Sequence, residues 1–362
     1  MKRAAVAAVA AAVLLGAAAV LWNVHARASV TEVTGLVGSE KEGFFADEAV
    51  RDRFAELGYR VQVRGRGSRA ITTADTGGVD FAFPSGAPAA EAFRTRHGVD
   101  REHRPFFSPM VVLSHRPVAE ALQRAEAAAP AGDGTWTLDM AAYLDLAEDG
   151  TRWRDLPGGA PEGTGRNTVL IRTTDPRTSN SAAMYLAVVG YLLNGEEVVS
   201  GPAPGVAERA VPLFLDQGGP PDTSRQPFDS YIALGPGHTP LLWAYESQYV
   251  AAGAAGELPE EAAVLYPAPT AVSAHTVLPL TGAGDEVGRL LTEDPELQRL
   301  AAEHGFRTTD PGVFADAAAA AGLPVRTRLD DTVNAPGHAA MEGLIREVER
   351  HYAGKPAAGT AG

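Results

Sequence analysis

The sequence predicts an α/β protein that folds into two lobes. At 362 residues the chain is longer than most single domains, so two lobes are the expected arrangement. Short apolar segments alternate with segments of helical periodicity from residue 33 onward, an order typical of a mainly parallel sheet flanked by helices. An Ala- and Pro-rich stretch that ends near Gly134 marks a boundary between the lobes.

The first lobe begins with a strand predicted at 33–38, which ends in a Gly-Ser-Glu-Lys-Glu-Gly loop. A helix is predicted over 47–57, because its apolar residues recur at helical spacing and Gly58 is a typical stop. Three further strands are predicted at 59–63, 79–83 and 110–113. These elements together predict one sheet with a helix packed on it.

The second lobe is predicted over 116–262. Its main elements are a helix at 138–146, a strand at 169–171, a helix from 181 to 194, and the segment 241–246. A strand at 263–267 would return the chain to the first lobe, which then comprises 29–115 and 263–352. Helices are expected there at 285–291, at 294–305 with Asp294 as N-cap and Pro295 in the first position, and along the apolar stripe from Met341 to Tyr352.

Composition excludes several classes of function. The formal net charge is −14 and no long Lys/Arg tract follows the N-terminus, which argues against a nucleic-acid partner. The chain has no cysteine, so disulfides, thiolate metal sites, cysteine nucleophiles and a lipid-modified cysteine anchor are all excluded. It also lacks H-E-x-x-H, G-x-S-x-G and Walker-type motifs. We therefore expect no catalytic residues, no metal site and no cofactor.

The N-terminus has the pattern of an export segment. Met1-Lys2-Arg3 precedes an apolar run from Ala4 to about Val24, and Ala26-Arg27-Ala28 matches an A-x-A cleavage pattern. A run of this length could also span a bilayer. Both a cleaved signal peptide and a retained membrane anchor over 1–28 fit, and both place the rest of the chain outside the cytoplasm, either secreted or membrane-anchored. The Pro/Ala/Gly-rich tail at 353–362 is expected to be disordered.

Three polar loops follow predicted strands or precede a helix. They are Ser39-Glu40-Lys41, Ser68-Arg69 and Ser179-Asn180-Ser181. Ligands of open α/β sheets bind outside the carboxyl ends of the strands, so loops of this kind from two lobes could converge on one cleft. The free N–H groups at a helix start suit an anionic ligand, although Ser and Asn there could equally serve as ordinary helix caps.

These loops also carry a family resemblance. Val37-Gly38-Ser39-Glu40-Lys41, Gly67-Ser68-Arg69, the segment 174–185 and the segment 288–307 resemble a type 2 periplasmic or extracellular solute-binding protein. More narrowly, they are similar to the actinobacterial family related to proteins that carry a von Willebrand factor A domain. The resemblance implies a two-lobed type 2 periplasmic-binding-protein-like fold in which two crossing strands join the lobes, each with a mainly parallel sheet flanked by helices.

The resemblance also implies a ligand site in the cleft between the lobes. The first lobe would contribute Ser39, Glu40, Lys41, Ser68 and Arg69, and the second lobe would contribute Ser179, Asn180, Ser181, Tyr245 and Glu246. Glu40 departs from the oxyanion binders, because a carboxylate beside a dianion repels it. Either Glu40 forms a salt bridge with Lys41 or Arg69, or the ligand carries a positive group.

The function implied is capture of a small polar or anionic solute for ABC-type uptake or for sensing. Expected partners are an ABC permease or a von Willebrand factor A domain protein, together with the membrane if the N-terminal segment is retained. Two alternatives stay open on the same fold, since a fold does not determine a function. One is an extracytoplasmic enzyme, and the other is an accessory or stress-response module that binds no ligand.

Overall fold

The computed structural model describes residues 30–352. The predicted export segment at 1–28 and the predicted tail at 353–362 lie outside the described residues. Over 30–352, no helix is both long enough and apolar enough to cross a membrane.

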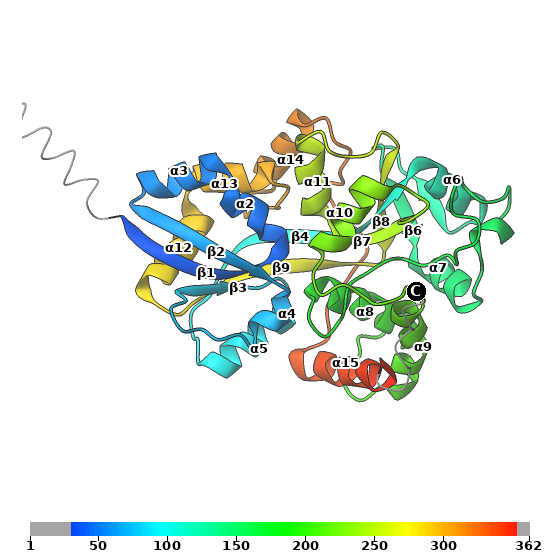
Figure 1. The fold of residues 1–362 in the computed structure, drawn as a ribbon, viewed down its shortest axis with the longest axis horizontal. Coiled ribbons are helices and arrows are strands. Elements are labelled where there is room, and N and C mark those ends of the chain that lie inside the picture. The colour runs from blue at the N-terminus through cyan, green and yellow to red at the C-terminus, as the bar shows by residue number, and fades with distance from the viewer. Residues whose placement is uncertain (1–29, 353–362) are drawn as a thin grey trace, which may run out of the picture.

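Two α/β lobes lie side by side, and strands run from one into the other (Figure 1). The strands form one mixed sheet in the order β2-β1-β3-β9-β4-β8-β6-β5, with β7 added on β4 and β10 on β9. Their bounds are β1 Thr31–Gly38, β2 Tyr59–Arg66, β3 Phe81–Phe83, β4 His103–His115, β5 Ala128–Pro130, β6 Trp136–Asp139, β7 Leu241–Tyr245, β8 Ala262–Ala268, β9 Thr270–Pro279 and β10 Thr332–Val333. The predicted α/β class is confirmed.

The two crossing strands are β4 and β9. The first half of β4 pairs antiparallel with β9, with Ser108 opposite Ser273, and its second half pairs antiparallel with β7 and β8. Parallel pairing is found for β1 with β2 and β3, for β6 with β8, and for β10 with β9. Parallel pairing thus dominates the outer part of the first lobe, whereas β4 makes the centre of the second lobe antiparallel. The sequence prediction that 263–267 returns to the first lobe is wrong, because this strand, β8, stays in the second lobe and β9 crosses instead.

The first lobe buries both faces of its sheet. In β1, Val33 and Val37 contact one apolar core while Leu36 contacts another on the opposite face, as the two-residue period of a strand requires. The first core is covered by α2 Glu42–Ala46, α3 Glu48–Glu56, α12 Gly282–Glu293 and α13 Pro295–Glu303, and the second by α4 Ser68–Ile71 and α5 Ala87–His97. The predicted cap Asp294 is confirmed, since it accepts the Leu297 N–H at the start of α13, and Asp47 caps α3 in the same way.

The second lobe repeats this design on β4, where Met110 and Val112 face one core and Val111 and Leu113 face the other. Its helices are α6 Arg116–Arg124, α7 Met140–Glu148, α8 Asn180–Leu193, α9 Pro204–Leu215, α10 Arg225–Leu234 and α11 Glu246–Ala254. The predicted strand at 169–171 is not formed. Only the isolated bridges Arg152–Thr168 and Arg172–Leu242 flank it, although Val169 and Ile171 are buried. An apolar segment can be buried without having a neighbouring strand to pair with, and it is then not a strand.

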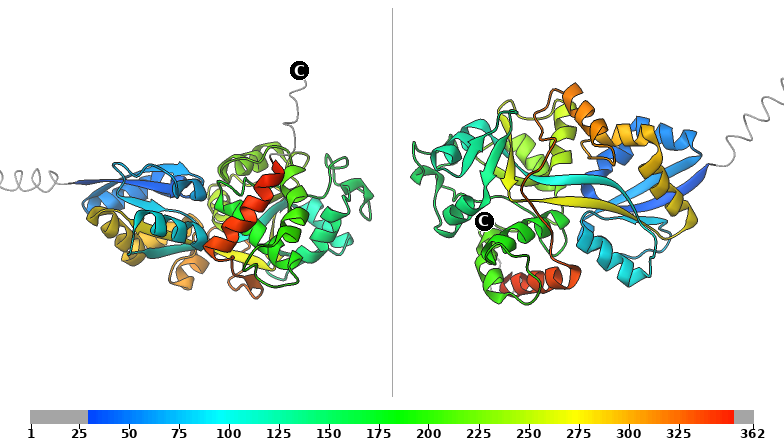
Figure 2. Two further views of the ribbon diagram at one scale, coloured as in Figure 1. Left: turned by 90° about the horizontal axis from the view of Figure 1, so that it is seen from below. Right: turned by 180° about the vertical axis from the view of Figure 1, so that it is seen from behind.

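The C-terminal helix α15 (His338–Tyr352) packs on the second lobe. Met341, Leu344, Ile345 and Val348 belong to the second-lobe core and α15 lies against α9. The chain reaches this position after α14 (Pro311–Ala320), by a segment that runs behind the crossing strands and includes β10 (Figure 2). This contact differs from the predicted assignment of all of 263–352 to the first lobe. The long segment before α15 lets its apolar stripe reach a partner in the other lobe.

Candidate functional site

A buried polar cluster lies where the first-lobe strands end. Directly after β1, the one-turn helix η1 (Ser39–Lys41) presents Glu40 and Lys41, and Ser85 follows β3. Lys41 is fully buried, and its Nζ donates to Glu40 and, at 2.8 Å, to Ser85 Oγ. It also lies 3.0 Å from Nδ1 of His275 on β9 and 4.8 Å from the centre of the Phe83 ring. The cluster therefore joins three neighbouring strands.

The charges within this cluster neutralise each other. Burial alone would raise the pKa of Glu40, but the Lys41 charge and hydrogen bonds from His275 and Lys41 hold this pKa well below its usual range. Burial lowers the pKa of Lys41, and Glu40 opposes that shift. Burial and the Lys41 charge lower the pKa of His275 to about 4, so this histidine is neutral near pH 7. Glu40 and Lys41 thus form a buried ion pair next to a neutral imidazole.

Uncharged groups face this cluster from the second lobe. Asn180, at the start of α8, donates through Nδ2 to Tyr245 OH and to Ser273 Oγ, both at 3.2 Å. The Tyr245 ring lies 5.7 Å from the His275 ring, which joins the two groups. Trp243 donates from Nε1 to the Ser181 carbonyl at 3.0 Å and so fixes the first turn of α8.

The two lobes contact each other directly. The backbone N–H groups of Arg69 and Ala70 in the first lobe donate to the Thr178 carbonyl in the second, at 3.0 and 3.2 Å. Asn180 fits against Gly86, since a Cβ on Gly86 would stand 1.9 Å from Asn180 Oδ1, and the Gly86 φ of +83° also favours glycine. The two lobes are therefore closed on each other, and Thr178 and Asn180 of the second lobe lie against first-lobe loops.

Three buried hydroxyls in the segment that leads into α8 have no hydrogen-bond partner among residues 30–352. They are Thr173 Oγ1 and Thr174 Oγ1, in the loop before α8, and Ser181 Oγ, in its first turn. A buried hydroxyl without a partner is costly, at roughly 1–3 kcal/mol. Such groups are the ones that a bound polar molecule could satisfy.

The structure brings most of the predicted site residues into one region. Glu40, Lys41 and Ser68 meet in the first lobe, where Ser68 Oγ accepts from the Ser85 N–H at 3.0 Å. Ser179, Asn180, Ser181 and Tyr245 gather at the start of α8 and the end of β7, and Ser39 is buried in η1. Whether any of these residues binds a ligand stays a prediction.

Two predicted residues point elsewhere. Arg69 forms an ion pair with Glu342 on α15. Glu246 is fully buried and both of its oxygens are engaged, by Arg307 at 2.7 and 2.8 Å and by the Tyr266 hydroxyl. Both charges are thus paired with other residues of the protein. These pairings do not support the predicted contact of Arg69 or Glu246 with a ligand between the lobes.

Sequence reasoning missed Ser85, Ser273 and His275. Ser85 follows a predicted strand and could have been found by the rule that identified the other loops. Ser273 and His275 lie two residues apart on β9, so they point to the same face, but β9 was not predicted at all. Polar residues inside a crossing strand have no turn signal that would identify them.

The cluster contains a serine, a histidine and a carboxylate, but not in the arrangement of a hydrolytic triad. His275 Nδ1 faces both Ser85 Oγ, at 3.2 Å, and Glu40 Oε1, at 3.5 Å, whereas its Nε2 has no hydrogen-bond partner within the described residues. A triad needs the nucleophilic serine and the orienting carboxylate on opposite ring nitrogens of the histidine. Lys41 Nζ is already engaged by Glu40, Ser85 and His275, which leaves it no free position from which to act as a base. The geometry therefore describes a structural charge cluster.

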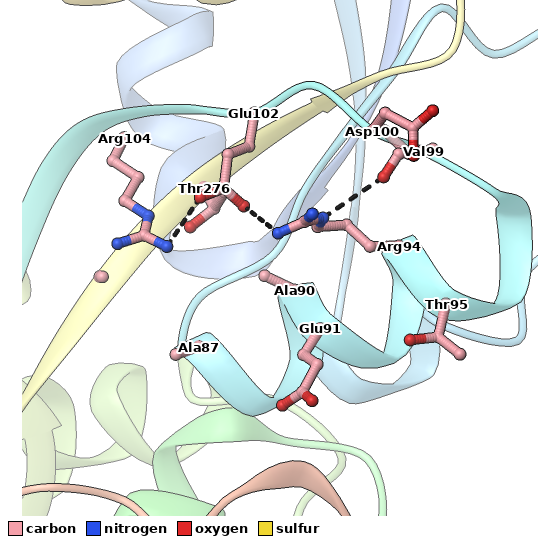
Figure 3. Close-up of a pocket in the computed structure, with 11 residues that line it drawn as sticks. Ala87, Ala90, Glu91, Arg94, Thr95, Val99, Asp100, Glu102, Arg104 and Thr276 are labelled. Carbon is pink, nitrogen blue, oxygen red and sulfur yellow. Dashed lines mark hydrogen bonds and ion pairs between the residues drawn. The ribbon is translucent and has the colours of Figure 1, made fainter.

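Four surface pockets of 310 to 590 Å³ lie outside this cluster, and Glu40, Lys41, Ser85 and His275 line none of them. One, of about 550 Å³, lies beside α5, where Arg94 and Arg104 both reach Glu102, at 2.9 and 2.7 Å (Figure 3). In the part of the chain that the structure describes, no group of three or more His, Asp or Glu side chains could hold a metal ion.

No family model and no curated protein sequence matches the chain. Solved structures do match its shape. The sulfate-binding protein SubI from Mycobacterium tuberculosis H37Rv is 18% identical, with a TM-score of 0.52, and the match covers 89% of this chain and 99% of SubI. The periplasmic binding protein AfuA from Actinobacillus pleuropneumoniae, solved with exogenous fructose-6-phosphate bound, is 12% identical, with a TM-score of 0.56 and coverage of 88% and 97%.

Iron-bound HitA from Pseudomonas aeruginosa is 13% identical, with a TM-score of 0.56, and the match covers 88% of this chain and 99% of HitA. These similarities extend over both lobes and the crossing strands. The chain therefore has the two-lobed fold of type 2 periplasmic solute-binding proteins.

Proposed function

We propose that this protein is an extracytoplasmic solute-binding protein that captures a small polar molecule between its lobes. The observation that carries the proposal is the direct contact of polar groups from both lobes, together with three buried hydroxyls in the segment that leads into α8, on Thr173, Thr174 and Ser181, that have no partner among the described residues. The fold, and the printed descriptions of its structural neighbours as binding proteins, support the same role.

The charges of the cleft favour a ligand without net negative charge. Glu40 already neutralises Lys41, the cation of the first-lobe cluster. Arg69 and Arg307 are held by Glu342 and Glu246. A buried site rewards a ligand that pairs with its free groups and penalises one that brings an unpaired charge. Of the polar and anionic solutes that the sequence allows, this charge balance supports an uncharged, hydroxyl-rich solute.

The biological setting belongs to the same proposal. An N-terminal export segment at 1–28 would place the clamp outside the cytoplasm, anchored or secreted, and an ABC permease would receive the solute. Membership in the actinobacterial family related to von Willebrand factor A domain proteins would add such a protein as a second partner. The resemblance of the polar loops and the two-lobed fold support these assignments.

Calorimetry with the full-length protein tests the proposal. A panel of neutral sugars and polyols, amino acids, sulfate and molybdate should include a neutral solute that binds and raises the melting temperature without being consumed. The double variant Ser179→Ala/Ser181→Ala should bind that solute about fivefold or more weakly, because each lost hydroxyl removes a hydrogen bond worth about 1 kcal/mol. Ser230→Ala, whose hydroxyl bonds a helix carbonyl on α10, is the matched control and should bind normally.

Three results would count against the proposal. Turnover of the solute would indicate an enzyme, and silence across the whole panel would indicate a module that binds no ligand. Unchanged affinity in the double variant would place the site elsewhere.

A further inference from the structure

One of the four surface pockets, called the seam pocket here, lies on the outside of the contact between the two lobes. The buried cluster does not line it. The seam pocket has a volume of about 590 Å³ and draws its walls from α4 and α5 of the first lobe, from the loop at 177–178, and from α15. The beginning of α15 lies beside α5, although the rest of the helix packs on the second lobe (Figure 2). The pocket is thus formed by both lobes together.

The walls of this seam pocket are unusually basic for a protein with a net charge of −14. Four arginines line it, namely Arg69, Arg96, Arg177 and Arg346, against one lining carboxylate, Glu342. On α15 the lining residues His338, Glu342 and Arg346 are spaced four apart, so they share one helix face, which lies beside the buried stripe. The local sign of charge governs what such a pocket attracts, whatever the total charge of the protein.

Two of these arginines have internal partners. Arg177 is held by Asp175, with an Nε to Oδ1 distance of 3.0 Å, and lies 3.8 Å from Glu349. Arg69 pairs with Glu342 through Nη2, but its Nε is buried without a partner among residues 30–352, and only 10% of the side chain is exposed. A buried guanidinium N–H that lacks an acceptor is an unsatisfied hydrogen-bond donor, which an oxygen atom of a ligand could satisfy.

The other two arginines have no internal partner. Within 30–352, the side chains of Arg96 on α5 and Arg346 on α15 form no ion pair or hydrogen bond, and both are exposed at the pocket rim. The pocket of Figure 3 makes the contrast clear, because there the carboxylate of Glu102 engages both arginines. The seam pocket therefore holds two positive charges without internal partners, one from each lobe, and is also lined by Arg69, whose buried Nε has no acceptor among the described residues.

We propose that the seam pocket binds a small polyanion whose oxygen atoms contact Arg96 and Arg346 together. Guanidinium groups recognise phosphate and carboxylate oxygens through paired N–H donors, so a diphosphate or a tricarboxylate fits this chemistry. Because its two cations belong to different lobes, the bound anion also ties the closed clamp from outside. This site is separate from the cleft and needs no solute there.

The test is calorimetric titration of the full-length protein at low ionic strength, with inorganic pyrophosphate and citrate as probes. The double variant Arg96→Gln/Arg346→Gln should bind the probe at least tenfold more weakly than the unmodified protein, since two charge-assisted pairs are lost. The control double variant Arg51→Gln/Arg328→Gln removes the same charge from exposed positions elsewhere and should bind normally. Binding of either probe with this pattern supports the site.

The remaining outcomes overturn it. If neither probe binds the unmodified protein, the seam pocket is not an anion site. If the two double variants weaken binding equally, the attraction is a general property of the surface charge and not of this pocket. Retained affinity in Arg96→Gln/Arg346→Gln places the anion elsewhere. The Ser179→Ala/Ser181→Ala variant should still bind the probe, so failure of the cleft proposal and failure of the seam proposal give different results.

Discussion

The two lobes differ, where they face each other, in how completely their own residues pair the charges and hydrogen-bonding groups there. The two facing surfaces are called the first-lobe wall and the second-lobe wall. On the first-lobe wall, Glu40, Lys41, Ser85 and His275 bond one another, so each charge has a partner, although His275 Nε2 has none among the described residues. On the second-lobe wall the charges beside Thr178, Asp175 and Arg177, pair with each other, whereas the Ser181 hydroxyl at the start of α8 lacks a partner among the described residues. The difference indicates that the charges hold the first lobe together and that the uncharged donors of the second lobe are the groups available to a ligand.

The largest expected effect comes from breaking the charge pair. Lys41→Met should lower the free energy of unfolding by about 3–5 kcal/mol, because it leaves a buried carboxylate without its cation. Denaturant unfolding measures this loss. Glu40→Gln/Lys41→Met should recover most of it, and Arg209→Met, which breaks a solvent-exposed pair with Glu148, should change little. A small loss for Lys41→Met would show that the first-lobe wall is not a structural charge cluster.

Two glycine variants should give a smaller loss of stability and should distinguish the contact between the lobes from simple backbone strain. Gly86→Ala and Gly58→Ala place an alanine at φ values of +83° and +88°, and each should cost about 1–2 kcal/mol of stability. Only at Gly86 would the new Cβ meet the second lobe, at Asn180, while the space around Gly58 is open. Small-angle scattering should therefore show a larger radius of gyration for Gly86→Ala alone. Equal radii for the two variants would contradict the closed contact described above.

The last effect concerns pH and is spread over several pH units. The pKa of His275 is lowered to about 4 in the folded protein from 6.5, so below about pH 6.5 the unfolded chain takes up a proton that the folded protein does not. Stability should fall as the pH drops from about 6.5 to about 4, with a slope of up to about 1.4 kcal/mol per pH unit from this group. Glu40 adds loss in the same direction below its ordinary pKa.

Unfolding of His275→Gln over the same pH range isolates the contribution of this histidine. The variant should show a shallower slope than the unmodified protein. An identical slope would mean that His275 titrates normally and that its site is wetter than the structure shows.

The sequence allowed the outer architecture to be predicted better than the centre. Strands and helices with clear periodicity or caps, such as 33–38, 59–63 and the helix capped by Asp294, form as expected. The crossing strand β9 and the one-residue bridges near 169–171 could not be predicted, because their partners are distant in sequence and pairing rather than composition defines them.

The site follows the same rule. Loops at strand ends were identifiable from glycine and hydroxyl residues, so Glu40, Lys41, Ser68 and the segment 179–181 were found. The direction of a long side chain was not, since Arg69 could reach either the cleft or α15 and the structure places it against Glu342. The partner of Glu40, one of two cations or a ligand group, could be decided only in three dimensions, and it is Lys41.

The most direct test of the account is sulfate binding to the unmodified protein and to Glu40→Gln, measured by calorimetry. Since Glu40 neutralises Lys41, the unmodified cleft should not bind sulfate, whereas Glu40→Gln should gain measurable affinity by freeing the Lys41 charge. Sulfate binding by the unmodified protein that is as tight as, or tighter than, binding by Glu40→Gln would contradict the claim that the charge pair is internal to the first lobe.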